Sequence, residues 1–173
     1  MVPMLHQARQ QLPYDPIEEA GRQWVSHGWG EAANGMLAIT SLMRAHQIAL
    51  AEVETALRPF GLTFARYEAL MVLFFSRRGS LPMGIIGSRL QVHQTSVTNA
   101  IDRLESAGLV ERSVHPTDRR TTIVAITEAG ARLATTATDA LNAQVFSDPP
   151  FQGDDLNELV AILRRLRQTA GDF

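Results

Sequence analysis

Residues 80–127 read SLPMGIIGSRLQVHQTSVTNAIDRLESAGLVERSVHPTDRRTTIVAIT, and this stretch decides the fold. Apolar residues recur at Val97, Ile101 and Leu104, which is the 3.6-residue period of a helix with one buried side. The opposite side carries short hydrogen-bonding groups and one guanidinium, from Thr95, Thr98, Asn99 and Asp102, with Ser96 and Arg103 on the flanks. A surface of this kind suits contact with the edges of DNA bases.

A shorter helix is predicted just upstream of this one. Ser80 can cap it and Pro82 fits its first turn. Its inner side would be formed by Ile85, Ile86 and Leu90. Because only three residues separate Leu90 from the next helix, the pair has the spacing of a helix-turn-helix.

The pattern changes after Gly108, which can end the helix in the left-handed conformation. Residues 109–114 and 121–126 then predict the two strands of a hairpin. The polar loop between them contains a proline and the adjacent Arg119 and Arg120, so it could put a cation into or beside a minor groove. The hairpin is therefore interpreted as a wing.

These residues resemble the MarR family of winged helix-turn-helix transcription regulators. The match lies in the order and spacing of Ser96-Val97-Thr98, Asp102-Arg103-Leu104-Glu105, Gly108-Leu109-Val110-Glu111-Arg112, Asp118-Arg119-Arg120 and Ile126-Thr127-Glu128-Ala129-Gly130. The resemblance implies a mainly α fold with a small β-hairpin wing, flanked by N- and C-terminal dimerisation helices. The chain departs from the family pattern at His93, where the family often has a capping Ser, and at Asn99, where it often has Arg.

The chain is expected to form a single MarR-like domain over residues 1–173. Residues 1–30 would form an N-terminal arm with a short helix. Residues 31–62 and 128–173 would supply dimerisation helices, and residues 63–127 would form the winged helix-turn-helix region that binds DNA.

The predicted helices outside the winged region carry more apolar surface than that region can cover. The longest, about residues 32–58, repeats apolar residues at spacings of three and four until Pro59 and Gly61 stop it. If the chain ends of two subunits interdigitate, this excess apolar surface is buried, and the two recognition helices lie about one DNA turn apart. We therefore expect a homodimer.

Composition excludes several other classes of protein. The 173 residues include no cysteine, and no apolar run is long enough to span a membrane. The five histidines lack the spacing of a metal clamp, and no nucleophile motif or phosphate-binding glycine loop is present. We expect a cytoplasmic protein that is not an enzyme, with no cofactor, no metal and no membrane partner.

Charge is modest for a DNA-binding protein. The net charge is −2 and the pI about 6.2, whereas residues 80–127 hold five arginines and four acidic residues, which gives +1. DNA binding would then depend on a few placed arginines, not on a broad positive field.

MarR-like proteins often bind small aromatic or other organic anions where the dimerisation helices meet the winged module. Residues suited to such an effector site are Trp24, Met43, Arg44, His46, Tyr67, Met71, Phe74 and Phe75, with Trp29 as a further aromatic group. Most of these could equally be core residues, and Trp24 and Trp29 could instead pack against a dimer partner.

The sequence thus predicts a sequence-specific regulator of transcription that binds double-stranded DNA. We expect a ligand-responsive repressor that acts as a homodimer on a palindromic operator. The alternative is a winged-helix dimer that serves as a protein interaction module without specific DNA binding.

Each predicted contact residue has a defined role. Thr95, Ser96, Thr98 and Asn99 would face the major groove, where the Asn99 amide can pair with adenine. Arg103 would bind a phosphate, Arg120 would enter the minor groove, and Arg119 would lie nearer the phosphates. Asp118 would orient the wing by holding the Arg120 guanidinium.

Overall fold

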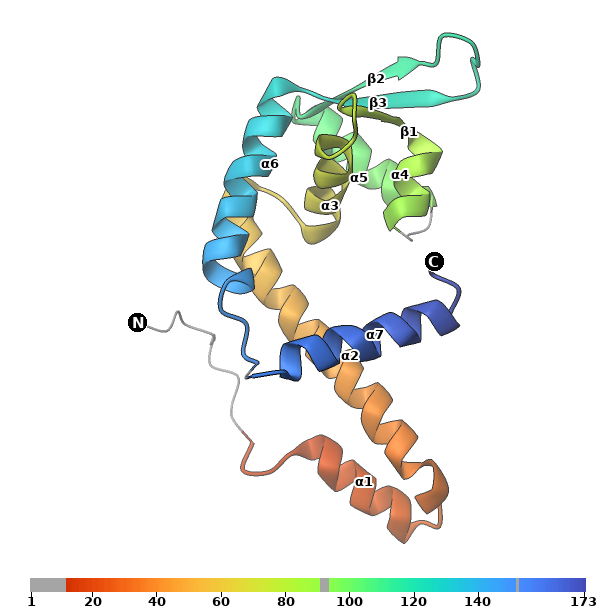
Figure 1. The fold of residues 1–173 in the computed structure, drawn as a ribbon, viewed down its shortest axis with the longest axis vertical. Helices are drawn as coiled ribbons and strands as arrows, with labels where there is room; N and C mark the ends of the chain where they lie inside the picture. The colour runs from red at the N-terminus through yellow and green to blue at the C-terminus, as the bar shows by residue number, and fades with distance from the viewer. Residues whose placement is uncertain (1–11, 91–93, 152) are drawn as a thin grey trace. The chain divides into compact units, whose positions relative to one another are not determined.

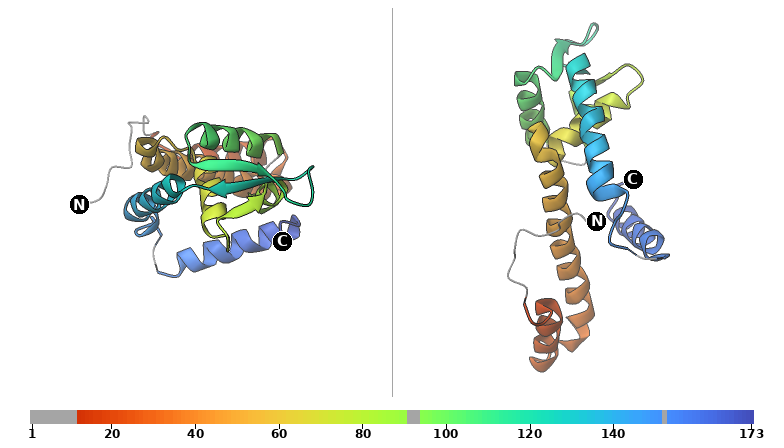
Figure 2. Two further views of the ribbon diagram at one scale, coloured as in Figure 1. Left: turned by 90° about the horizontal axis from the view of Figure 1, so that it is seen from above. Right: turned by 90° about the vertical axis from the view of Figure 1, so that its left-hand side faces the viewer.

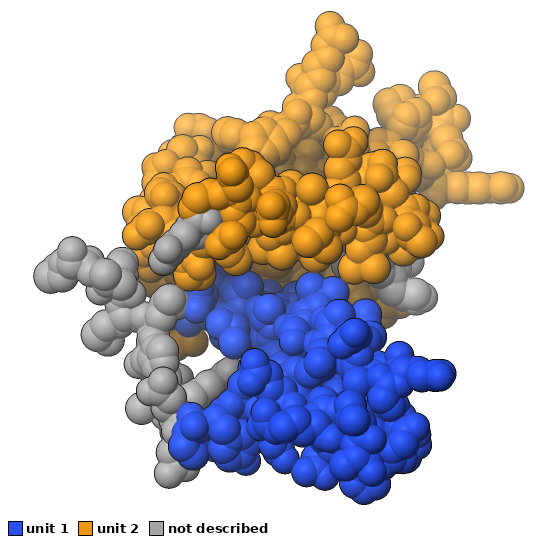
Figure 3. Space-filling model, turned by 60° about the horizontal axis from the view of Figure 1, so that its bottom comes forward, with its two compact units in different colours: residues 1–55 blue, residues 56–173 orange. Residues whose placement is uncertain are grey.

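The computed structural model describes residues 12–90, 94–151 and 153–173 (Figure 1). In this part of the chain the elements are α1 (Pro16–Ser26), α2 (Gly30–Leu57), α3 (Phe64–Phe74), β1 (Ser80–Pro82), α4 (Met83–Leu90), α5 (Gln94–Ser106), β2 (Val110–Val114), β3 (Thr122–Ile126), α6 (Glu128–Leu141) and α7 (Asp155–Thr169). A 3-10 turn, Arg58–Phe60, follows α2, and a π turn, Asn142–Phe146, follows α6. The chain divides into two compact units, residues 1–55 and 56–173 (Figure 3). The single-domain boundaries remain a prediction.

The first unit contains α1 and most of α2. Asp15 caps α1 by accepting a hydrogen bond from the Ile17 backbone N–H at 2.8 Å. The chain turns into α2 at Gly28, whose φ of +83° is in the left-handed region that glycine tolerates. Gly21 is buried against Leu37, and a Cβ built on Gly21 would lie 3.0 Å from the Leu37 side chain. The two helices therefore pack at a small residue.

The first unit exposes apolar side chains along α2. Ile39 is 53% exposed, Met43 59% and Ile48 44%. The predicted apolar repeat of this helix is present, and α2 ends at Leu57 beside Pro59. Most of the repeat before Val53 lies at the surface of this chain. Such a run of exposed apolar residues on a monomer is typical of an interaction surface.

The second unit has a helical core around α3. Thr63 caps α3, and its side chain accepts from the Arg66 backbone N–H. Side chains that are 2% exposed or less meet here from several elements: Leu57, Leu70, Leu73, Ile86, Val97, Ile101, Leu104, Val110, Val124 and Leu141. The apolar spacing of residues 64–77 predicts a helix that reaches Arg77, but α3 ends at Phe74, and Phe75 is 75% exposed. The predicted apolar stripe of α3 is thus buried only in its first part.

A three-stranded antiparallel sheet replaces the predicted two-stranded hairpin. Its strand order is β1-β3-β2, and Figures 1 and 2 show the strands side by side above α3, α4 and α5. In β1, Ser80 pairs with Ala125 and Pro82 with Ile123. Ser80 is therefore a strand residue and not a helix cap. Proline is tolerated at the end of an edge strand, since no donor is needed on the outer side.

The helix after β1 begins at Met83, later than predicted. Ile86 is fully buried as expected, but Ile85 is 42% exposed and does not contribute an inner side chain. The shift follows from β1, because residues in extended pairing cannot also form the first helical turn.

The corner between β3 and α6 is fixed by Thr127 and Gly130. The Thr127 hydroxyl donates to the Gly108 carbonyl at 2.8 Å and accepts from the Gly130 backbone N–H at 3.0 Å. The Thr127 backbone N–H donates to the Leu109 carbonyl, also at 3.0 Å. Thr127, a residue type that favours helix N-caps, thus caps α6 and joins that cap to the turn before β2.

Candidate nucleic-acid interface

The helix α5 has the two-sided character that its sequence predicts. Val97, Ile101 and Leu104 are 1% exposed or less. On the other side, Thr95, Ser96, Asn99 and Arg103 are exposed, whereas Thr98 is half-buried. The predicted turn at residues 91–93, with its departure at His93, lies outside the described residues.

A surface hollow lies on the exposed side of α5. It has a volume of about 410 Å³ and is lined by Asn99, Asp102, Arg103 and Ser106. Two predicted contact residues, the amide of Asn99 and the guanidinium of Arg103, are therefore brought together around one concave surface. Asp102 adds a carboxylate to it, which would oppose an approaching phosphate.

The wing loop is closed by hydrogen bonds from Asp118. One carboxylate oxygen accepts from the Arg120 backbone N–H at 3.0 Å, and the other accepts from the Thr121 hydroxyl at 2.7 Å. The Thr121 backbone N–H donates to the Asp118 carbonyl at 3.0 Å, and the His115 N–H donates to the Thr121 carbonyl at 2.9 Å. Asp118 therefore holds the backbone of the loop.

The expected contact between Asp118 and the Arg120 guanidinium is absent from the described wing loop. The carboxylate uses its lone pairs on the hydroxyl of Thr121 and the backbone N–H of Arg120, and these two bonds lower the pKa of Asp118. The Arg119 and Arg120 side chains are exposed and form no ion pair with any acid in the described parts of the chain. Both guanidinium groups are thus available to a phosphate backbone or groove.

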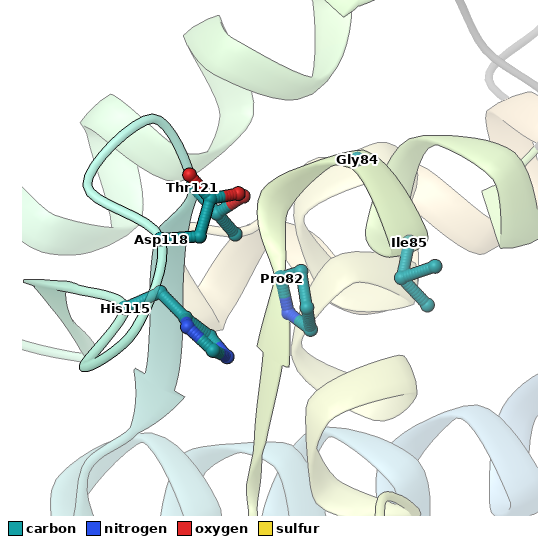
Figure 4. Close-up of a pocket in the computed structure, with 6 residues that line it drawn as sticks. All are labelled: Pro82, Gly84, Ile85, His115, Asp118 and Thr121. Carbon is teal, nitrogen blue, oxygen red and sulfur yellow. The ribbon is translucent and has the colours of Figure 1, made fainter.

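A shallow groove separates the wing loop from the start of α4. It has a volume of about 370 Å³, and its lining residues are Pro82, Gly84, Ile85, His115, Asp118 and Thr121 (Figure 4). The exposure of Ile85 is explained by this position at the rim of the groove. The wing loop is therefore positioned beside the first helix of the helix-turn-helix as well as beside β3.

One charged residue of this region was not singled out from the sequence. Arg112 in β2 forms ion pairs with Asp102 at 2.6 Å and with Glu105 at 2.8 Å, both on α5. A signal was available, because Val110 and Arg112 share one face of the strand while Asp102 and Glu105 share one face of the helix. Arg112 is therefore paired within the protein and is not among the arginines available to DNA.

The predicted effector residues are divided between the two units. In residues 1–55, Trp24 makes an edge-to-face contact with Trp29 at 5.3 Å between ring centroids. The other candidates there are exposed on α2: Met43, Arg44 and His46. The role of these residues in effector binding stays a prediction.

The effector candidates of the second unit belong to α3 and its end. Tyr67 is 7% exposed, and its hydroxyl lies 2.9 Å from the Thr138 hydroxyl of α6. The Thr138 hydroxyl also lies 3.5 Å from the Met71 sulfur. Phe74 and Phe75 are exposed and meet edge to face at 5.8 Å. Tyr67 and Met71 thus help join α3 to α6, which corresponds to the alternative of a core role.

Two helices in sequence, the second with an exposed polar face, and an adjoining hairpin wing define a winged helix-turn-helix protein. The family model for the MarR family matches residues 62–122. The structure resembles that of Sco5413, a MarR family transcriptional regulator from Streptomyces coelicolor, with 48% sequence identity and a TM-score of 0.74. That match covers 81% of this chain and 97% of Sco5413. The chain belongs to the MarR family.

Two further relatives agree with this assignment. The HTH-type transcriptional regulator MhqR of Bacillus subtilis (strain 168) is 29% identical over 122 residues, which are 70% of this chain and 75% of MhqR. Sco3205, a MarR family transcriptional regulator from Streptomyces coelicolor solved in complex with DNA, shares the fold at 20% identity and a TM-score of 0.68. This match covers 93% of this chain and 92% of Sco3205.

Family membership gives the general function. The protein is a DNA-binding transcriptional regulator, and MarR family regulators are not enzymes. The alternative of an interaction module without DNA binding has no support from these relatives. In the described ranges, no three acidic or histidine side chains are grouped to hold a metal ion. No helix there is long and apolar enough to cross a membrane.

Proposed function

We propose that the protein is a homodimeric repressor that binds a palindromic operator through α5 and the wing loop. The observation that carries this proposal is the pairing of two features. Because the apolar row of α5 is buried, the opposite side of the helix, which carries Asn99, faces solvent. Asp118 holds a loop whose two arginines have no acidic partner in the described chain. A helix face reads bases in a major groove, while a loop cation binds the adjacent minor groove.

The proposed homodimer is supported by apolar side chains on both units. On α2 these include Ile39, Met43 and Ile48, and on α7 they include Leu156, Val160, Ile162 and Leu166, all more than 40% exposed. Obligate interfaces of this kind bury on the order of 2,000–5,000 Å² in total. Residues 31–62 and 128–173 would supply that interface, and residues 63–127 would bind DNA.

The proposed effector is a small organic or aromatic acid. The candidate residues offer aromatic rings and methionines together with Arg44 and His46, a combination that suits a planar anion. Repression would respond to such a ligand only if it binds the free dimer more tightly than the DNA-bound dimer. We also propose a cytoplasmic location, where a regulator of this kind can reach the chromosome.

The test of DNA recognition begins with a pool of duplexes that have a randomised core. The wild-type protein should enrich a palindromic sequence, and its affinity for the selected duplex should exceed that for a scrambled duplex by about 10³-fold or more. Enrichment of no sequence, or equal affinity for both duplexes at two salt concentrations, would overturn the proposal.

The dimer has a separate test. Analytical ultracentrifugation should show a dimer at the concentrations that bind the selected duplex. A folded monomer that binds this duplex with the same affinity and a stoichiometry of one would show that the apolar surfaces serve another purpose.

A further inference from the structure

Arg112 occupies a core-facing position in the wing strand β2. Val110, two residues earlier and on the same face of the strand, is 1% exposed, while the intervening Glu111 is exposed. Across the ladder, Arg112 pairs with the fully buried Val124 of β3. Its side chain is only 23% exposed. A guanidinium at such a position needs a specific structural reason, since burial of a charge without partners is costly.

The partners are two carboxylates on α5. One terminal nitrogen, Nη2, lies 2.6 Å from the Asp102 carboxylate, and the other, Nη1, donates to Glu105 at 2.8 Å. Asp102 and Glu105 are three residues apart, so they share one side of the helix. The planar fork of arginine can reach both at once, whereas lysine has a single ammonium.

This cluster also sets the charge at the edge of the α5 surface. Asp102 lines the same hollow as Asn99 and Arg103 and is 51% exposed. Without Arg112 the helix would present two uncompensated carboxylates close to the proposed path of the phosphates. With Arg112 the cluster of three side chains has a net charge of −1 instead of −2. Repulsion of DNA by α5 is reduced accordingly.

We propose that Arg112 is a positioning residue of the DNA interface, which fastens the wing strand to α5 and neutralises the carboxylates of that helix without contacting DNA itself. The Nε and Nη2 atoms are shielded from solvent and donate no hydrogen bond within the described chain, but Nη2 is ion-paired with Asp102. Because Nη1 donates to Glu105, no terminal nitrogen is left to offer a phosphate. The inference rests on the proposed DNA-binding function. It adds a residue through which the wing and the recognition helix depend on each other.

The experiment is a double-mutant cycle on DNA affinity. The probes are the duplex selected by the wild-type protein and a scrambled duplex of the same length, measured by fluorescence anisotropy across a range of salt concentrations. Arg112→Met is made in the wild-type background and in a background that carries Asp102→Asn and Glu105→Gln. In the wild-type background it should weaken binding to the selected duplex about tenfold or more, because two carboxylates lose their partner.

The second background separates the possible roles of Arg112. With neutral residues at 102 and 105, Arg112→Met should change affinity by less than about threefold. An arginine that binds a phosphate would instead give the same loss in both backgrounds, and the salt slope would fall by about 0.9 for each phosphate that is no longer neutralised. That outcome would overturn the inference. So would an unchanged affinity of Arg112→Met in the wild-type background.

Two controls complete the design. Arg22→Met also removes an ion-paired arginine, the partner of Glu19 on α1 and outside the proposed dimer and DNA interfaces, and should leave the affinity unchanged. If Arg112→Met does not fold, Arg112→Lys serves in its place; it keeps the charge but not the fork, so it should lose affinity in the wild-type background and little in the neutral one.

If the wild-type protein selects no duplex, the proposed function itself fails. If it selects one but the cycle shows no coupling, only the role of Arg112 fails.

Discussion

Gly130 lies so close to Leu109 that a Cβ built on Gly130 would stand 2.1 Å from the Leu109 carbonyl oxygen. The same Cβ would lie 2.9 Å from the Ile126 side chain. The backbone of α6 can therefore reach the turn before β2 only where residue 130 has no side chain. This close approach explains in physical terms why an apolar-Thr-x-x-Gly run follows the wing.

Gly130→Ala should destabilise the protein by about 1–3 kcal/mol or more, because a backbone oxygen cannot move aside as a flexible side chain can. Chemical denaturation measures the change. Gly84→Ala is the matched control, since a Cβ at Gly84 meets nothing within 4 Å. The control should be neutral or stabilising by about 0.5–1 kcal/mol. Equal stability of the two variants would contradict the prediction.

Asp118→Asn should loosen the wing loop and weaken binding to the selected duplex at neutral pH. The pKa of Asp118 is lowered in the folded protein by its bonds to Thr121 and the Arg120 backbone. Its stabilisation of the loop is therefore present above the unfolded-state pKa and is lost as pH falls through the folded-state pKa.

The amide signals of Arg120 and Thr121, followed by NMR, measure this loss. Their acid transition in the wild-type protein should have a midpoint below about 3.9, the ordinary pKa of Asp. Circular dichroism at each pH shows whether the whole protein remains folded. A midpoint at or above the ordinary value, or the same transition in Asp118→Asn, would count against the role of Asp118.

Asn99→Ala should relax base selection at one position in each half-site. A bidentate amide contact to adenine contributes about 1–3 kcal/mol of discrimination. Selection with the variant protein, or affinities for a set of singly substituted duplexes, would show the change. The scrambled duplex is the control, because its affinity should stay the same. Equal losses on selected and scrambled DNA would mean that Asn99 does not read sequence.

Arg120→Ala should cost about 1–3 kcal/mol in each half-site and lower the salt slope by about 0.9 for each phosphate that Arg120 neutralises. The Arg120 side chain is exposed, and its guanidinium is not held by Asp118. Asp118→Ala should therefore weaken binding through loop order and leave the salt slope unchanged. If both substitutions weaken binding alike without any change of slope, Arg120 acts only by shaping the loop.

Local signals in the sequence predicted the parts of the fold that depend on near neighbours. Asp15, Thr63 and Thr127 each cap the helix that follows, because the hydroxyl or carboxylate and the N–H that it accepts from are two or three residues apart. The buried row of α5 could also be predicted from the sequence, since its period is a property of one helix. The family resemblance was confirmed by relatives that cover most of the chain.

Features that depend on distant partners were not predicted. Ser80 and Pro82 have helix-start chemistry, yet they pair with residues of β3 more than 40 positions later. A three-residue edge strand carries too short a pattern to be detected. The pairing of Arg112 with α5 likewise joins two elements whose patterns are separate in the sequence. The loop bonds of Asp118 were missed because a carboxylate next to arginines suggests an ion pair first.

If the wing loop binds DNA as proposed, its closure in the free protein lowers the entropy cost of that binding. Ordering a flexible residue costs roughly 1–2 kcal/mol of conformational entropy. The bonds that join Asp118, Arg120, Thr121 and His115 already order the loop in the free protein, so this entropy is lost during folding and not at the DNA. In the proposed complex the two wing arginines would meet the groove on a preformed support, and only their side chains would have rotamer freedom left to lose.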